Sequence, residues 1–321
     1  LIYRRSIKRQ MSRELQKNQD TRFHIFHMLI GTGGVYSALW ICLYSTSLMD
    51  QYLYFNFSSE KEGLITNWGA YYGKCLSIIG IICAIICIFC LMPIRRIMLL
   101  IEREEHRVAR EKLGILFHQC ALITIPTAVF LAVLSENMLD ALFAGSQKYA
   151  VAWMQIGSVM IVPCVFASVF VEILLKSRRI KYVVGIGIIA LLLHTGLLIL
   201  LLKTTQLGIT AVFLSGIAFY VVIMVCGFFL IRRSFQYTQE WMKSFVVTIL
   251  SSAIAGVIAM LLNKVFAPML GTVISLIICL LVAILVYMVL LIVMRAFRDG
   301  EMEEMPGGRI LSLLAGLIHF S

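Results

Sequence analysis

Charged residues are scarce in this chain of 321 residues, in which Asp, Glu, Lys and Arg together make up only 14%. Soluble domains average about 25% charged residues, because their surfaces face water. Hydrophobic residues instead make up 60% of the chain, and the mean hydropathy is +0.93. This composition excludes an ordinary water-soluble domain and indicates that much of the folded surface meets lipid.

The sequence also lacks the alternation of apolar and polar residues that predicts the strands of a membrane β-barrel. Its apolar runs are continuous, and each is long enough to cross the hydrocarbon core as a helix. We therefore predict an all-α, multi-pass transmembrane protein. Its spans, about eight in number, are expected at 24–48, 69–92, 113–135, 151–175, 182–202, 208–231, 244–262 and 269–294.

Catalytic signatures are missing as well. There is no Gly-rich phosphate loop, no HExxH and no Ser/His/Asp set at useful spacing. Cys83, Cys87 and Cys90 recur on one face of a predicted helix, but no His, Asp or Glu accompanies them. We interpret them as small packing side chains rather than as metal ligands. We expect no enzyme activity, no metal and no cofactor.

Lys and Arg are distributed unevenly between the two sets of connections that alternating spans would create. Of the 28, 23 fall in 1–22, 93–112, 176–181, 232–243 and 295–321. The other five, scattered over the opposite side, are Lys61, Lys74, Lys148, Lys203 and Lys264. The positive-inside rule then predicts a cell-membrane protein with both ends of this segment in the cytoplasm. The net charge of +11 is explained by anionic membrane lipids, so no nucleic-acid partner is expected.

One basic connection has a pattern of its own. Apolar residues recur at helical spacing in IRRIMLLIEREEHRVAREKL, residues 94–113, with charged residues between them. This pattern predicts an amphipathic helix that lies in the cytoplasmic interface of the membrane. A shorter helix is predicted at 136–145, on the opposite side.

Four segments carry, in order, patterns of a known family. They are NWGAYYGKCLSIIGIICAIICIFCLMPIRRI, ITIPTAVFLAVLSENMLDALFAG, QLGITAVFLSGIAFY and VYMVLLIVMRAFRDGEMEEMPGGRIL. The first three resemble the eighth helix, the following segment and a later helix opening of bacterial flippases in the multidrug/oligosaccharidyl-lipid/polysaccharide exporter superfamily. The fourth is similar to the closing helix and tail of that family's stage V sporulation protein B branch. The resemblance covers residues 24 to 315.

The resemblance implies the C-terminal lobe of a two-lobe, MATE-like flippase, with an N-terminal lobe absent from this sequence as its partner. It is thus expected either that the sequence is a fragment or that the other lobe comes from elsewhere. The implied divisions are a basic cytoplasmic linker at 1–22, a six-helix lobe at 23–240, a terminal helix pair at 241–296 and a cytoplasmic tail at 297–321. In this family the terminal pair forms a groove for an undecaprenyl tail, although helices that merely face lipid would show the same pattern.

The activity that the resemblance implies is alternating-access transport of an undecaprenyl-pyrophosphate-linked saccharide, a peptidoglycan or polysaccharide precursor, across the bacterial plasma membrane. Its expected partners are that substrate and membrane lipids. Two alternatives stay open. One is a cation-coupled drug or metabolite antiporter of the same superfamily, and the other is a non-transporting scaffold in cell-wall or spore assembly.

Candidates for a substrate cavity lie near the non-cytoplasmic end of the first two spans. Lys74 follows Tyr71 and Tyr72, so it is either a lysine that reaches the outer membrane surface within an aromatic belt or a cavity cation for a pyrophosphate. Asp50, at the end of the first span, is either an ordinary polar residue at a helix exit or a cavity residue paired with Lys74. The resemblance implies a role in the substrate cavity for four residues, which are Lys74, Asp50, Tyr71 and Tyr72.

Two further residues are candidates for ion or proton coupling. Glu172 precedes Lys176 by four residues, which predicts a helical ion pair, with a proton or cation carboxylate as the alternative. His194 lies nine residues before Lys203, about 13 Å inside the membrane at 1.5 Å per residue. It is predicted to be a neutral imidazole with an internal hydrogen bond, and a proton relay is the alternative.

Overall fold

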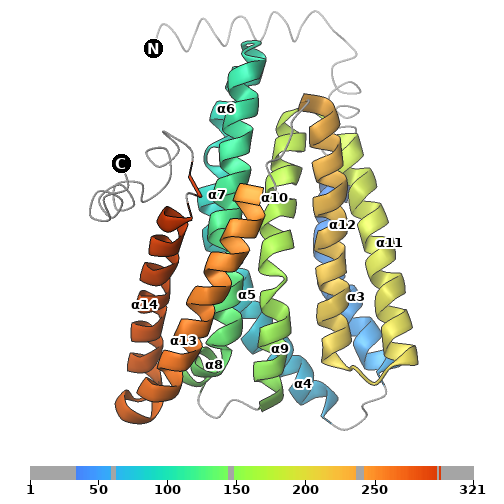
Figure 1. Cartoon of the computed structure of the whole chain (residues 1–321). Helices are drawn as coiled ribbons and strands as arrows, with labels where there is room; N and C mark the ends of the chain where they lie inside the picture. The colour runs from blue at the N-terminus through green and yellow to red at the C-terminus, as the bar shows by residue number, and fades with distance from the viewer. Residues whose placement is uncertain (1–33, 59–62, 144–147, 236–241, 295, 298–321) are drawn as a thin grey trace, which may run out of the picture.

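The computed structural model describes residues 34–58, 63–143, 148–235, 242–294 and 296–297, and within them it contains helices and no strand. Long helices run up and down between two ends of the molecule, as Figure 1 shows. Their bounds are α3 (Gly34–Phe57), α4 (Leu64–Ala70), η2 (Tyr71–Leu76), α5 (Ser77–Leu91), α6 (Ile94–Glu102), α7 (His106–Val133), α8 (Ser135–Leu142), α9 (Lys148–Ser158), α10 (Ile161–Lys176), α11 (Ile180–Thr204), α12 (Ile209–Phe235), η3 (Met242–Val247), α13 (Thr248–Leu270) and α14 (Thr272–Val293).

Seven helical segments of the described chain are long and apolar enough to cross a membrane. They are Leu64–Glu102, His106–Val133, Lys148–Lys176, Ile180–Thr204, Ile209–Phe235, Phe245–Leu270 and Thr272–Val293. Each contains most of one predicted span, so these seven predictions are confirmed as helices. The described part of the chain is therefore helical, as composition predicted, and its long apolar helices are those expected of a multi-pass membrane protein.

The first predicted span, 24–48, differs from the structure. Residues 24–33 lie outside the described part, and α3 continues to Phe57, well beyond the predicted end at 48. Asp50 and Gln51 lower the hydropathy at this point, which is why the sequence predicted a helix end. The helix continues because Leu53 and Tyr54 are buried in the core and because Asp50 has a buried partner on another helix.

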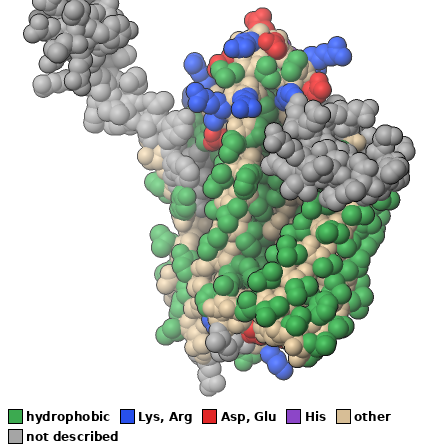
Figure 2. Space-filling model, turned by 90° about the vertical axis from the view of Figure 1, so that its left-hand side faces the viewer, with side chains coloured by type: hydrophobic (Ala, Val, Ile, Leu, Met, Phe, Trp, Pro, Cys, Tyr) green, Lys and Arg blue, Asp and Glu red, His purple; other side chains and the backbone are tan. Residues whose placement is uncertain are grey.

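On the face that Figure 2 shows, most basic side chains of the described residues gather at one end of the molecule, drawn uppermost. Figure 2 shows Lys and Arg at that end, above a broad band of hydrophobic side chains. Among the described lysines, Lys74, Lys148, Lys203 and Lys264 belong to the lower half. The charge asymmetry predicted from the sequence therefore corresponds to a real separation in space.

The prediction of an interfacial helix at 94–113 is wrong in its orientation. Figure 1 shows α6 standing upright above α5, where it forms a hairpin with the beginning of α7. The apolar stripe exists, and its members Ile94, Ile97 and Met98 are buried. They pack against neighbouring helices rather than lipid headgroups, since α6 contacts α7 and α10. The amphipathic pattern alone did not show whether the apolar stripe packs on other helices or on the membrane interface.

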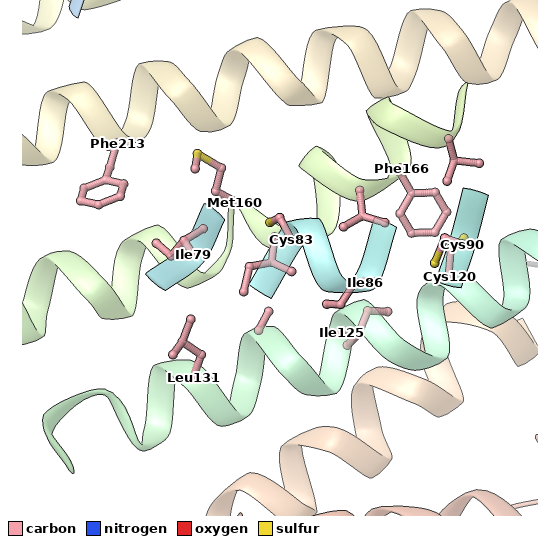
Figure 3. Packing of buried hydrophobic residues seen from close by; sticks show 14 of the residues in the cluster. Ile79, Cys83, Ile86, Cys90, Cys120, Ile125, Leu131, Met160, Phe166 and Phe213 are labelled. Carbon is pink, nitrogen blue, oxygen red and sulfur yellow. The ribbon is translucent and has the colours of Figure 1, made fainter. Parts of the chain in front are cut away.

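The main hydrophobic core joins α5, α7, α9, α10 and α12. Figure 3 shows Cys83 and Cys90 of α5 among the packed side chains, with Cys90 next to Cys120 of α7. Cys83 and Cys90 are buried, as the packing interpretation predicted, whereas Cys87, the third cysteine of α5, is only partly buried. No group of three His, Cys, Asp or Glu side chains in the described chain is arranged to hold a metal ion.

The terminal pair, α13 and α14, packs against α7 and α8 and forms a separate core with α7. The Tyr287 hydroxyl of α14 donates to the Leu122 carbonyl of α7 at 2.8 Å. Gly256 of α13 permits close packing here, because a Cβ at this position would lie 2.7 Å from a methyl group of Val129. The pair is thus attached to the bundle by specific contacts.

Candidate functional site

A buried ionisable pair joins α3 to α11. The Nε2 atom of His194 lies 2.8 Å from Oδ1 of Asp50, which is hydrogen-bonding distance. The His194 side chain is fully buried, and that of Asp50 is 9% exposed. Burying such groups in an apolar bundle is costly unless they are paired, and ionisable residues at membrane depth commonly mark a transport or proton pathway. This pair is the candidate functional site.

The ends of the same two helices give the depth of the pair. Near the lower end, the Lys203 ammonium of α11 lies 4.8 Å from the ring centroid of Phe57, the last residue of α3. Asp50 precedes Phe57 by seven residues, and His194 precedes Lys203 by nine. At 1.5 Å per residue, both members lie about 10–14 Å from this end. They are therefore inside a hydrocarbon core of about 30 Å, at matching heights.

The surroundings of the imidazole come from α12. The ring of Phe219 meets the His194 ring edge-on, with centroids 5.8 Å apart. The Nδ1 atom of His194 is enclosed, and the backbone at Ser215 approaches the ring without the geometry of a full hydrogen bond. A change in the protonation of this ring would therefore alter contacts of α3, α11 and α12 together.

The predicted partnership between Asp50 and Lys74 is wrong. Asp50 bonds His194 instead, and it lies within a helix rather than at a helix exit. The Lys74 ammonium lies 5.5 Å from the centroid of Phe143, directly after α8. The sequence offered both Lys74 and His194 as possible partners of the Asp50 carboxylate. The packing of α3 on α11 places His194 next to it.

Lys74 belongs to a π-helical turn, Tyr71–Leu76, which interrupts the regular helix between α4 and α5. Such turns are rare and occur frequently at functional sites. The side chain is partly buried, so it is neither a fully exposed surface lysine nor a core residue. Its cavity role is not tested by this position, and it stays a prediction.

The two tyrosines beside Lys74 have different surroundings. Tyr71 is buried and meets Phe213 edge-on, with centroids 4.8 Å apart. Tyr72 is 50% exposed and stacks on Trp68 at 6.2 Å. Tyr71 therefore packs within the core, and Tyr72 lies at the surface as an aromatic-belt residue would.

Glu172 and Lys176 form the predicted helical ion pair, with Oε1 of Glu172 2.9 Å from Nζ of Lys176. Both side chains are about one-third exposed, at 32% and 37%. The pair lies in the last turns of α10, at the opposite end of the molecule from Lys203. The structure thus joins His194 to Asp50 and leaves Glu172 apart from them.

An apolar groove runs between α7 and α14, with a volume of about 550 Å³. Its wall on α7 extends from Gln119 to Leu134, and its wall on α14 extends from Leu276 to Leu291. Each wall spans sixteen residues, or about 22 Å of helix from first to last, most of a hydrocarbon thickness. Ile82 of α5, Met138 of α8 and Phe297, which follows α14, complete the lining. The resemblance implied a groove at the terminal pair, but hydropathy gave no means of locating its walls, because side chains that face lipid and side chains that face a groove are equally apolar.

A neutral polar cluster lies at the lower end of the terminal pair. Asn137 of α8 and Asn263 of α13 exchange two amide hydrogen bonds, of 2.6 and 2.9 Å, and the Ser275 hydroxyl of α14 donates to Asn263 Oδ1 at 2.9 Å. Sequence reasoning missed it. The available signal was two asparagines close to apolar spans, since buried amides require partners.

No protein-family model matches the chain, and no curated protein matches it significantly. The functional interpretation therefore depends on the residues and geometry described above and on the segment patterns of the sequence.

Proposed function

We propose that this chain is part of a membrane transporter that moves a lipid-linked, anionic substrate between leaflets, as one lobe of a flippase of the exporter superfamily that its segments resemble. The single observation that carries the proposal is the α7–α14 groove. Its length suits an extended hydrocarbon chain, and its lining offers almost no polar group that would favour another ligand. An undecaprenyl-pyrophosphate-linked saccharide is the proposed substrate.

The position of Lys74 supports an anionic headgroup. The Lys74 ammonium lies over the ring of Phe143, which directly follows α8. The stretch that contains α8 also supplies Leu134 and Met138 to the lower end of the groove. An ammonium is a compact charge that suits a pyrophosphate. In this proposal the hydrocarbon chain of the substrate stays in the groove while its headgroup passes near Lys74, and no covalent step is required.

The experiment compares two tryptophan variants of adjacent leucines in α14. Leu280 lines the groove and Leu281 does not, and Leu281 is 62% exposed. In vesicles containing the intact protein, Leu280→Trp should slow flipping of a fluorescent undecaprenyl-pyrophosphate saccharide at least ten-fold, because an indole would fill the groove. Leu281→Trp should leave the rate unchanged. Equal rates in both variants would contradict a role for the groove.

Lys74→Ala tests the headgroup separately. Flipping of the pyrophosphate lipid should fall, whereas a neutral lipid-linked saccharide should be moved at the unaltered rate. Unchanged flipping of both lipids, with normal expression, would remove Lys74 from the substrate path. Absence of any flipping by the unaltered protein would favour the scaffold function instead.

The Asp50–His194 pair favours a second candidate, a proton-coupled antiporter of drugs or metabolites. Here transport of a small cation would depend on an imposed pH gradient and would be lost in Asp50→Asn. The antiporter alternative is excluded if Leu280→Trp abolishes flipping and the flipping rate of the unaltered protein does not depend on the pH gradient.

A further inference from the structure

A second apolar pocket lies between α10, α12 and η3, with a volume of about 340 Å³. It shares no lining residue with the groove. Aromatic rings dominate its lining, and they come from four elements: Phe117, Phe166, Phe170, Phe228, Phe229 and Phe245. None of the lining side chains carries a charge, so the pocket suits a hydrocarbon chain and not a polar ligand.

One wall of the pocket leads directly to two arginines. Val225 and Phe229 line the pocket and are 41% and 60% exposed, so they also face the surroundings of the bundle. Arg232 and Arg233 follow in the last turn of α12, three and four residues after Phe229. Residues at this spacing share one helix face, so the Cα atoms of both arginines lie about 5 Å further along the helix than that of Phe229, on the same wall.

The arginines are open to an anion. Both are exposed, and neither forms an ion pair with a carboxylate in the described chain. The acidic side chain near the end of α10, Glu172, is already paired with Lys176 at 2.9 Å. The apolar pocket and the two arginines therefore follow one another along α12 in the order that the acyl chain and the phosphate of a membrane lipid require.

We propose that the α10–α12–η3 pocket, together with Arg232 and Arg233, is a binding site for an anionic phospholipid. One acyl chain occupies the aromatic pocket, and the phosphate accepts hydrogen bonds from the guanidinium groups, which present several donors to phosphate oxygens. Basic groups beside pockets between membrane helices recognise such headgroups generally. A free phosphate would leave the pocket empty, so the acyl chain is part of the recognition. This site is separate from the proposed transport path.

The test measures lipid retention by native mass spectrometry of the intact protein in detergent, with phosphatidylglycerol and phosphatidylcholine added separately. The unaltered protein should retain phosphatidylglycerol preferentially. Arg232→Ala/Arg233→Ala should weaken phosphatidylglycerol binding roughly ten- to thirty-fold, as expected for two cations near a lipid phosphate. The matched control is Arg95→Ala/Arg96→Ala, an adjacent exposed pair at the same end of the molecule, which should leave binding unaltered.

Val225→Trp tests the pocket itself, because an indole on this wall would occupy the space of an acyl chain. It should abolish retention of phosphatidylglycerol while both arginines remain. Arg232→Lys/Arg233→Lys, which keeps the charge, should retain part of the preference and shows whether the alanine variant lost binding through misfolding. If Arg95→Ala/Arg96→Ala weakens phosphatidylglycerol binding as much as Arg232→Ala/Arg233→Ala does, the site is overturned in favour of diffuse charge attraction. Unaltered binding in Val225→Trp would overturn the role of the pocket.

Discussion

Two of the polar contacts between helices of the bundle differ in chemistry. Asp50 and His194 connect α3 to α11 through one contact between ionisable groups, and the second ring nitrogen has no full hydrogen bond. Asn137 and Asn263 connect α8 to α13 through two reciprocal amide bonds, with Ser275 as a third member. The first contact can change with protonation, and the second cannot.

This difference indicates different roles. A fully paired neutral cluster stabilises the packing of helices and can be explained by structure alone. A buried ionisable pair is a poor stabilising device, because well-packed apolar residues of similar size often serve equally well. Its presence is therefore better explained by a function that needs protonation or a charge inside the membrane.

The largest effect is expected from breaking the ionisable pair. Asp50→Ala should lower the free energy of unfolding in detergent by about 3 kcal/mol, because His194 would stay buried without its partner. Asp50→Leu/His194→Leu should recover most of that loss and yet abolish transport. A double variant that transports normally would show that the pair is only structural.

An intermediate effect is expected from the neutral cluster. Asn263→Ala removes both amide bonds and the acceptor of Ser275, and it should cost about 1–2 kcal/mol in the same unfolding measurement. The transport rate per folded molecule should not change. Asn56→Ala is the control, since its amide only donates to the Tyr52 carbonyl in an exposed turn of α3. A transport defect in Asn263→Ala would end the distinction between the two contacts.

The smallest effect is expected at Glu172. Its contact with Lys176 is partly exposed and lies within one helix, so Glu172→Gln should cost only about 0.3–0.5 kcal/mol. The loss should become smaller in high salt, because the ions screen the exposed pair. A loss comparable to that of Asp50→Ala would mean that Glu172 has a second, unrecognised role.

Sequence reasoning predicted most of the fold and part of the site. The seven long apolar helices follow from apolar runs that only a helix can carry across lipid, and the Glu172–Lys176 pair follows from local spacing. Asp50 and His194 were both recognised as candidates, but as members of different sites. They are 144 residues apart, and no local pattern states that α3 packs on α11.

The orientation of α6 and the two apolar pockets show the same limit. An amphipathic stripe requires an apolar partner but does not specify whether lipid or another helix supplies it. Likewise, a leucine that lines the α7–α14 groove and a leucine that faces lipid contribute equally to hydropathy, so the sequence does not distinguish their positions.

The sequence by itself determined that the chain forms apolar helices and that its basic residues gather at one end, since both depend on the transfer of individual side chains between water and lipid. Only the tertiary structure decided which helices touch. That choice depends on the shapes of facing side chains and on the pairing of buried polar groups, which hydropathy does not encode.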